Sequence, residues 1–118
     1  MPGYQGKILR VDLTDRRTWV EEKDEDFYRT YWGGRGIIAY YLLNEVPVGA
    51  DPLGPENLLV FAAGPITGLP LAGSGRNSVG GKSPLTGGYG DAEGGGFFGA
   101  EMKRAGFDAI VVKGKADK

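Results

Sequence analysis

The sequence predicts an α+β fold with mixed sheets and two helices, in the order ββαβββαβ. Two observations support this class. Short strand-like segments outnumber the two segments with helical spacing, and the order lacks the regular strand–helix alternation of a parallel α/β fold. With 118 residues, of which 41% are hydrophobic and 25% charged, the chain is expected to form a single domain over residues 1–118.

A hairpin is expected at the N-terminal end. Residues 6–12 alternate between apolar and polar side chains, and a second short strand over residues 18–21 follows through turn residues 14–17. The acidic run at residues 21–26 suits the N-terminus of a short helix, where carboxylates face the partial positive charge of the helix end. We interpret this run as a solvated helix start rather than a site for a partner.

The central part is predicted to form a helix and a buried strand. Residues 37–46 present a broad apolar face, and Pro47 ends this helix because proline lacks the backbone N–H that a helix interior needs. Residues 57–63 contain the continuous apolar run LLVFAA, which fits a buried strand.

The C-terminal part is expected to hold three strands and the second helix. Residues 75–80 and 87–92 are predicted to be glycine-rich strands around a turn with the sequence KSPLTG. Residues 97–105 form the helix, with Gly106 as its left-handed cap, and residues 108–113 form the last strand.

The residue types that the sequence lacks narrow its chemistry. With no cysteine and no histidine, the chain itself holds no disulfide, thiolate zinc site, cysteine-ligated iron–sulfur cluster or Ser–His nucleophile. The net charge of -1 argues against nucleic acid as a partner. No apolar run approaches the ~20 residues that span a bilayer and no secretory pattern is present, so we expect a cytoplasmic protein without membrane contact.

Residues 64–106 are the most informative segment, because they hold 14 of the 22 glycines. About a third of these positions are glycine, against about 7% in ordinary proteins, a density that suits tight turns or close approach of a ligand to the main chain. We interpret the segment as a cradle for a phosphate-bearing cofactor. A P-loop is not expected, because Arg76 stands where its first glycine is required and Pro84 follows the Gly-Lys-Ser end.

Charged residues around this cradle suggest how an anion could be held. Residues 94–96 precede the helix predicted from residue 97, and the N-terminus of a helix attracts anions. Asp91 and Glu93 lie just upstream, where carboxylates need a hard cation such as Mg²⁺ to share a site with phosphate. Arg76 can donate two parallel hydrogen bonds to a phosphate. The simpler alternative, glycines in tight turns and Arg76 in a surface ion pair, stays open.

Five segments carry a resemblance to a known family: GKILRVDL, WGGRGIIAYYLL, PENLLVFAAGPITG, KSPLTG and GGFFGAEMKRAGFDAIVVKG. In this order, they are similar to the N-terminal domain of the tungsten-containing aldehyde:ferredoxin oxidoreductase family. The resemblance implies tungsten, or molybdenum, held by two pterin (molybdopterin) cofactors that a Mg²⁺ links, with the N-terminal domain as their base. It also implies a nearby [4Fe–4S] cluster, ferredoxin as electron acceptor, and oxidation of aldehydes to carboxylic acids.

Three positions match cofactor contacts of that family. Arg76 in GSGRNS matches an arginine that contacts the pterin cofactor, and Glu93 and Gly95 in DAEGGG match two contacts near the Mg²⁺. Well-known members carry asparagine at the Glu93 position. Glu93 therefore preserves a Mg²⁺ contact made by the backbone carbonyl but alters one made by the side chain. No catalytic residue is implied within this chain.

The resemblance also implies which functions lie outside the chain. The family's cluster cysteines and acid–base residues belong to later domains, so we expect partners in the remaining oxidoreductase domains or a partner subunit, and ferredoxin only indirectly. The chain spans about half of an internally duplicated N-terminal domain, so we expect an uncovered sheet edge or apolar face, and self-association. The alternative is a non-catalytic module that binds or helps to assemble a molybdopterin-type cofactor.

Overall fold

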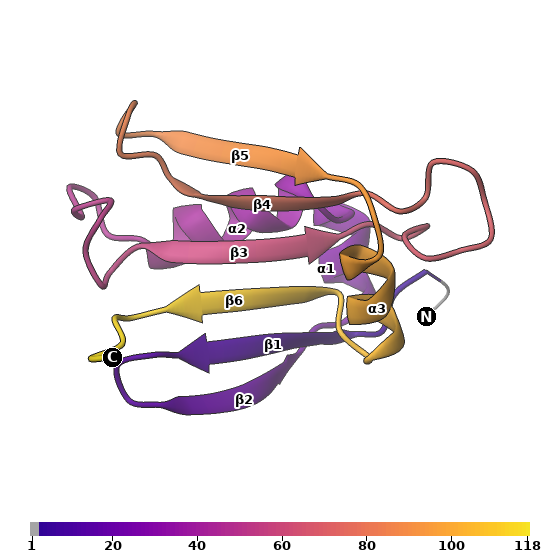
Figure 1. Cartoon of the computed structure of the whole chain (residues 1–118), viewed down its shortest axis with the longest axis horizontal. Helices are drawn as coiled ribbons and strands as arrows, with labels where there is room; N and C mark the ends of the chain where they lie inside the picture. Colours follow the sequence, from indigo (N-terminus) through magenta and orange to yellow (C-terminus); the bar gives the residue numbers. More distant parts are fainter. Residues whose placement is uncertain (1–2) are drawn as a thin grey trace.

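The fold is built on one six-stranded sheet, which the computed structural model describes together with three helices over residues 3–118 (Figure 1). The strands are β1 (Lys7–Asp12), β2 (Arg17–Glu22), β3 (Leu58–Ala63), β4 (Asn77–Lys82), β5 (Tyr89–Gly94) and β6 (Ala109–Lys113). Their spatial order is β2-β1-β6-β3-β4-β5. Strands β1 and β6 pair in parallel, while the other neighbours pair antiparallel. The expected α+β class with a mixed sheet is therefore confirmed.

Three helices accompany this sheet, α1 (Glu25–Tyr31), α2 (Arg35–Glu45) and α3 (Phe98–Arg104). The expected order with two helices is wrong by one, because the acidic run begins a helix of its own. The side chain of Asp24 accepts a hydrogen bond from the backbone N–H of Phe27 at 3.0 Å, which satisfies an otherwise unpaired donor at the start of α1. Within residues 3–118, no helix has the length and apolar character that a bilayer span requires.

One face of the sheet packs against α1 and α2, which lie behind it in Figure 1. Alternate residues of the central strands point to this side, and they include Ile8, Leu58, Val60, Ala62, Ala109 and Val111. They meet the helix side chains Phe27, Tyr28, Ile37, Ile38 and Tyr41. This contact forms the main hydrophobic core, in which each large side chain contributes roughly 1.5–3 kcal/mol through burial.

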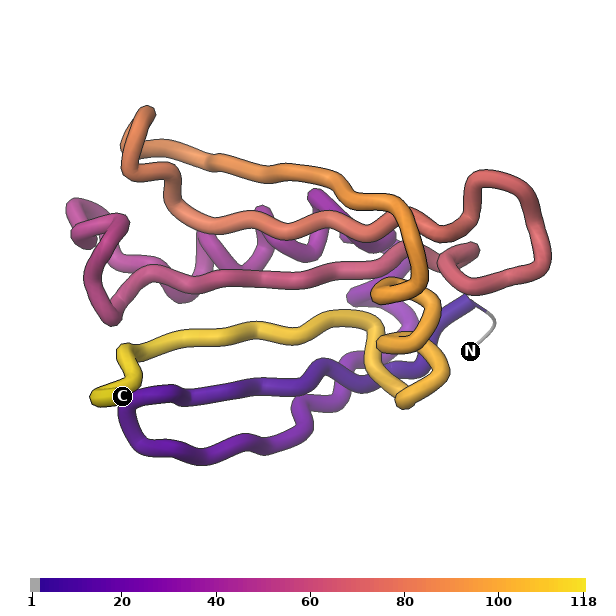
Figure 2. The backbone as a smooth tube through the Cα atoms, in the orientation of Figure 1, coloured from indigo at the N-terminus to yellow at the C-terminus, as the bar shows by residue number. Residues whose placement is uncertain are grey.

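The opposite face of the sheet is largely uncovered. One row of residues in register crosses all six strands on this face: Val20, Leu9, Ile110, Phe61, Val79 and Ala92. Figure 2 shows α3 at one end of the sheet only, and there the ring of Phe98 lies 5.6 Å from that of Phe61. Leu59 on the same face stays 46% exposed. The molecule thus has the uncovered apolar face that we expected from the resemblance.

The end of α3 follows the predicted cap. The backbone N–H of Gly106 donates to the carbonyl of Lys103 at 3.0 Å, and that of Phe107 donates to the carbonyl of Met102 at 3.1 Å. These two bonds form a Schellman motif, which needs a left-handed residue at its centre. Gly106 has φ +100°, where a side chain would be strained, so the sequence placed this helix end correctly.

Candidate functional site

The residues expected to contact a cofactor lie together at the β5 edge of the sheet. Arg76 directly precedes β4, Gly95 directly follows β5, and the two strands pair Asn77 with Gly94 at this end. A Cβ atom added to Gly95 would lie 3.7 Å from Nη1 of Arg76. The antiparallel pairing of β4 and β5 therefore makes Arg76 and Gly95 neighbours.

Glu93 joins this pair from β5, where it lies opposite Ser78. Its Oε2 is 3.6 Å from Nη2 of Arg76, and its Oε1 is 3.6 Å from Nη2 of Arg35. The carboxylate thus lies between two guanidinium groups, at distances longer than a direct hydrogen bond. All three predicted residues are brought together, and their role in binding stays a prediction.

Arg35 is a member of this site that the sequence reasoning missed. It is the first residue of α2, and its Nε donates to Oδ2 of Asp91 at 2.5 Å. This hydrogen bond raises the pKa of Arg35 above its ordinary value, so the guanidinium stays charged. Its positive charge was the sequence signal that could have revealed it. An arginine in the first turn of a helix is repelled by the helix dipole, so its presence there indicates a carboxylate partner elsewhere in the fold. We call Arg35, Asp91, Glu93 and Arg76 the edge cluster.

Arg76 is fixed through its backbone while its guanidinium stays accessible. The buried hydroxyl of Thr67 donates to the carbonyl of Arg76 at 3.2 Å and accepts from the N–H of Gly64 at 2.8 Å. The Arg76 side chain is 58% exposed, and within residues 3–118 only the long ion pair with Glu93 holds its guanidinium. A planar group with free, parallel N–H donors is suited to binding a phosphate or carboxylate.

The main chain beside Arg76 is crowded on one side and open on the other. A Cβ atom added to Gly75 would lie 2.9 Å from the carbonyl oxygen of Gly96, so the loops before β4 and after β5 touch through their backbones. A Cβ atom added to Gly94 or Gly96 would meet nothing within 4 Å. The glycines therefore leave a bare stretch of main chain next to Arg76 that a ligand can approach closely.

The acidic side chains of the edge cluster do not form a metal site on their own. Within residues 3–118, no three acidic side chains converge in a way that could hold a metal ion. Asp91 and Glu93 instead face guanidinium groups. Their backbone carbonyl groups can still act as metal ligands, because β5 is an edge strand.

The hydrogen-bond pattern of the β4–β5 ladder leaves the carbonyl of Glu93 unpaired with β4. The N–H of Ser83 donates to the carbonyl of Gly88 at 2.7 Å, and bonded and non-bonded pairs alternate along an antiparallel ladder. Counting in register from this pair, Ser78 and Glu93 form a non-bonded pair. The carbonyl oxygen of Glu93 therefore points to the open edge of the sheet, where it can serve as a ligand for a hard cation.

The structure agrees with the rejection of a P-loop. The Gly-Lys-Ser sequence forms the end of β4 and the turn after it, rather than the start of a helix. The ammonium group of Lys82 donates to the carbonyl of Ala50 at 2.7 Å. Lys82 thus ties the turn after α2 to the sheet and does not face the edge cluster.

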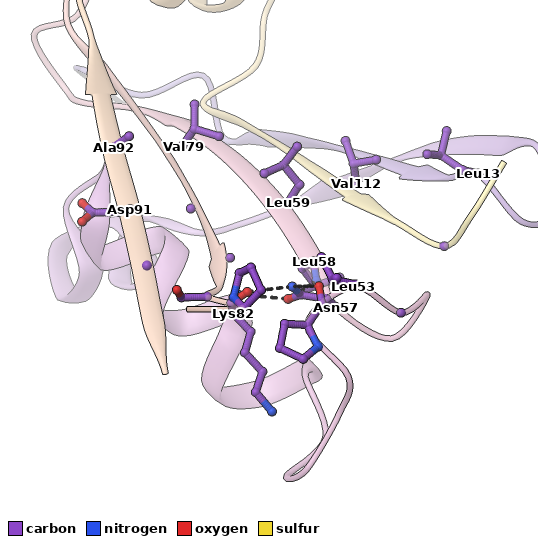
Figure 3. A pocket seen from close by; sticks show the side chains of 18 residues that line it. Leu13, Leu53, Asn57, Leu58, Leu59, Val79, Lys82, Asp91, Ala92 and Val112 are labelled. Atoms are coloured by element: carbon purple, nitrogen blue, oxygen red, sulfur yellow. Dashed lines mark hydrogen bonds between the residues drawn. The ribbon is translucent and has the colours of Figure 1, made fainter. Parts of the chain in front are cut away.

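A depression of about 610 Å³ lies on the open face of the sheet, away from the predicted residues (Figure 3). Leu59, Val79 and Val112 form part of its floor. Figure 3 shows the carboxylate of Asp91 pointing away from these side chains. The lining includes Asp91 of the edge cluster but not Arg76, Glu93 or Gly95, so this apolar hollow adjoins the candidate cofactor site without containing the three predicted residues.

Known proteins are similar to this sequence over nearly its whole length. Residues 8–118 match the family described as aldehyde ferredoxin oxidoreductase, N-terminal domain. The chain is 51% identical, over 99% of its length, to the tungsten-containing aldehyde ferredoxin oxidoreductase of Pyrococcus abyssi (strain GE5 / Orsay), and it covers 19% of that protein. It is 40% identical, over 98% of its length, to the aliphatic sulfonate oxidoreductase, WOR-like subunit, of Pyrococcus furiosus, and it covers 19% of that protein.

The fold also matches a solved structure, the active-site complex BamBC of benzoyl coenzyme A reductase in complex with 1,5-dienoyl-CoA. The TM-score is 0.94 and the identity 38%, over 98% of this chain and 18% of the other. The chain thus spans about a fifth of the length of the relatives it matches. Sequence and fold agree, and the chain belongs to the aldehyde ferredoxin oxidoreductase family, in which residues 8–118 match the N-terminal domain.

Proposed function

We propose that this chain is the pterin-binding N-terminal part of a tungsten or molybdenum oxidoreductase that oxidises aldehydes to carboxylic acids with ferredoxin as electron acceptor. The observation that carries the proposal is the meeting of Arg76, Glu93 and Gly95 at one sheet edge, in a chain half-identical to tungsten-containing aldehyde ferredoxin oxidoreductases. The bound metal–pterin group would supply the redox chemistry. The residues of this chain would bind and orient it.

Each residue of the site has a distinct part in that binding. Arg76 donates hydrogen bonds to a phosphate or pterin group, because its guanidinium is accessible and its backbone is fixed by Thr67. Gly95 lets the ligand approach the main chain beside that guanidinium. Glu93 would hold Mg²⁺ through its carbonyl oxygen, since its carboxylate already faces two arginines. In this arrangement glutamate can replace asparagine without adding uncompensated charge near the phosphates.

Electron transfer requires parts that this chain does not contain. It has no cysteine to bind an iron–sulfur cluster, and it covers 19–20% of the tungsten-containing relatives. We therefore propose that residues 1–118 form one structural domain that acts with further oxidoreductase domains or a partner subunit in the cytoplasm. Those parts would carry the [4Fe–4S] cluster and the contact with ferredoxin, and the isolated chain would be inactive. A chain that binds pterin but never joins such parts would instead be a carrier or assembly module.

The test compares cofactor retention in the complete oxidoreductase with Arg76 and with Arg76→Ala. Hydrogen bonds to charged groups contribute roughly 1.5–3 kcal/mol, so we expect about 10- to 100-fold weaker retention of the cofactor in the variant. Metal analysis and pterin fluorescence after extensive dialysis measure it. Arg29→Ala is the matched control, because Arg29 lies on the surface of α1 and, among the residues that the structure describes, pairs only with Glu25. Unchanged tungsten and pterin content in Arg76→Ala would contradict the proposed role.

We also propose that the isolated chain self-associates through its open sheet face. Leu59 lies on that face and is 46% exposed, beside the half-buried Val79 and Val112. Sedimentation equilibrium should show a dimer that Leu59→Gln weakens. Leu43→Gln should leave the mass unchanged, because Leu43 is 85% exposed on α2 at the other side of the sheet. A monomeric mass for the parent chain at high concentration would rule out the dimer.

A further inference from the structure

We infer that Arg35 is a positioning residue that holds Asp91 and Glu93 in place, so that Arg76 keeps its N–H donors free for an anionic ligand. The inference rests on the proposed anion-binding role of Arg76. Its basis is the geometry of the edge cluster, in which two guanidinium groups and two carboxylates face one another.

The contacts within the edge cluster are unequal. Arg35 makes a direct hydrogen bond to Asp91 at 2.5 Å, whereas Glu93 is shared, with one oxygen 3.6 Å from each guanidinium. The Asp91 side chain is only 18% exposed, so its position is well defined by its surroundings. Arg35 therefore holds Asp91 against the start of α2, while its attraction for Glu93 balances that of Arg76 and leaves the Glu93 carboxylate midway, short of a hydrogen bond with either guanidinium.

The backbone that carries Arg35 is fixed to the sheet. The N–H of Gly34 donates to the carbonyl of Ala63 at 3.1 Å, which fixes the start of α2 to the end of β3. In the first turn of a helix a cation meets the partial positive charge of the helix end, so Arg35 does not stabilise α2 by itself. Asp91 and Glu93 of β5 compensate for the unfavourable position of this positive charge, and their attraction to Arg35 in turn restrains the two carboxylates.

Removal of Arg35 should let Glu93 pair directly with Arg76. With its second partner gone, the Glu93 carboxylate can close the 3.6 Å gap to Arg76 by the roughly 0.8 Å needed to form a charge-assisted pair. A guanidinium that already binds a carboxylate in two parallel hydrogen bonds has fewer donors for a phosphate. The predicted consequence is weaker anion binding at a residue that Arg35 does not touch.

The experiment titrates the 118-residue chain with inorganic pyrophosphate and follows the side-chain Nε–Hε NMR signals of its arginines. We expect pyrophosphate to shift the Arg76 signal in the parent chain. Arg35→Ala should bind at least about 5-fold more weakly, and its ligand-free Arg76 signal should already show a paired guanidinium. Arg35→Lys should keep part of the affinity, because lysine restores the charge without the forked geometry.

Two double variants separate positioning from net charge. Arg35→Ala with Glu93→Gln should recover most of the lost affinity, because the competing carboxylate is gone. Arg35→Ala with Asp91→Asn has the same net charge but retains Glu93, so it should stay weak. Equal rescue by both, or unchanged affinity in Arg35→Ala, would overturn the inference while leaving the anion site intact. Equal pyrophosphate binding by the parent chain and Arg76→Ala would instead overturn the proposed site, and the inference with it.

Discussion

Two clusters in this fold pair cations with carboxylates, one in the interior and one at a sheet edge. In one, Lys103 of α3 and Asp108 before β6 form an ion pair at 3.0 Å, with side chains only 8% and 2% exposed. In the other, the edge cluster, the two guanidinium groups are 65% and 58% exposed. The first cluster lies in the interior and the second at a sheet edge, so their energetic consequences differ.

The difference is clearest in how many hydrogen bonds each cation makes. The ammonium group of Lys103 donates to Asp108, to the carbonyl of Gly3 at 2.6 Å and to the carbonyl of Gly64 at 3.2 Å. Asp108 also accepts from the N–H groups of Gln5 and Gly6. Every donor of Lys103 is used, whereas Arg76 keeps its donors available. A saturated buried pair organises the chain, and an unsaturated exposed one can bind a ligand.

The largest predicted effect comes from breaking the buried pair. Lys103→Met removes three hydrogen bonds and leaves the buried carboxylate of Asp108 without its counter-charge. We expect the free energy of unfolding to fall by about 3–5 kcal/mol, measured by urea denaturation. This is a large share of the free energy of unfolding of an ordinary domain, which is about 5–15 kcal/mol.

A neighbouring arginine gives the matched control for Lys103→Met. Arg104 lies next to it on α3 and pairs with Glu101 at the surface, where both side chains are more than 60% exposed. Arg104→Met should change the free energy of unfolding by less than about 1 kcal/mol. If the two substitutions destabilise the chain equally, Lys103 does not organise the interior as we describe.

The sequence predicted local structure better than it predicted how distant segments meet. The helix over residues 37–46 and the cap at Gly106 follow from spacing and from the conformational preference of glycine. The predicted number of helices left out α1, because a seven-residue helix carries little periodicity, although its acidic start was recognised. The six-stranded order, with β6 between β1 and β3, depends on long-range pairing that no local pattern specifies.

The candidate site shows the same limit. Arg76, Glu93 and Gly95 were found through resemblance, and their proximity follows once β4 and β5 are paired. Arg35 comes from a helix more than 50 residues away in sequence from Asp91. Its part in the edge cluster depends on how α2 crosses the sheet, which spacing within the segment WGGRG does not reveal.

The smallest predicted effect on stability comes from Arg76, and it completes the comparison with Lys103. Arg76→Ala removes one long, exposed ion pair, so we expect the free energy of unfolding to change by no more than about 0.5 kcal/mol. Urea denaturation of the same chain used for Lys103→Met provides the measurement. A loss of several kcal/mol would mean that Arg76 maintains the loops around β4 and β5, and reduced cofactor retention in that variant would then reflect misfolding. An unchanged free energy of unfolding would instead mean that Arg76 does not stabilise the fold, so the retention experiment would report on cofactor binding alone.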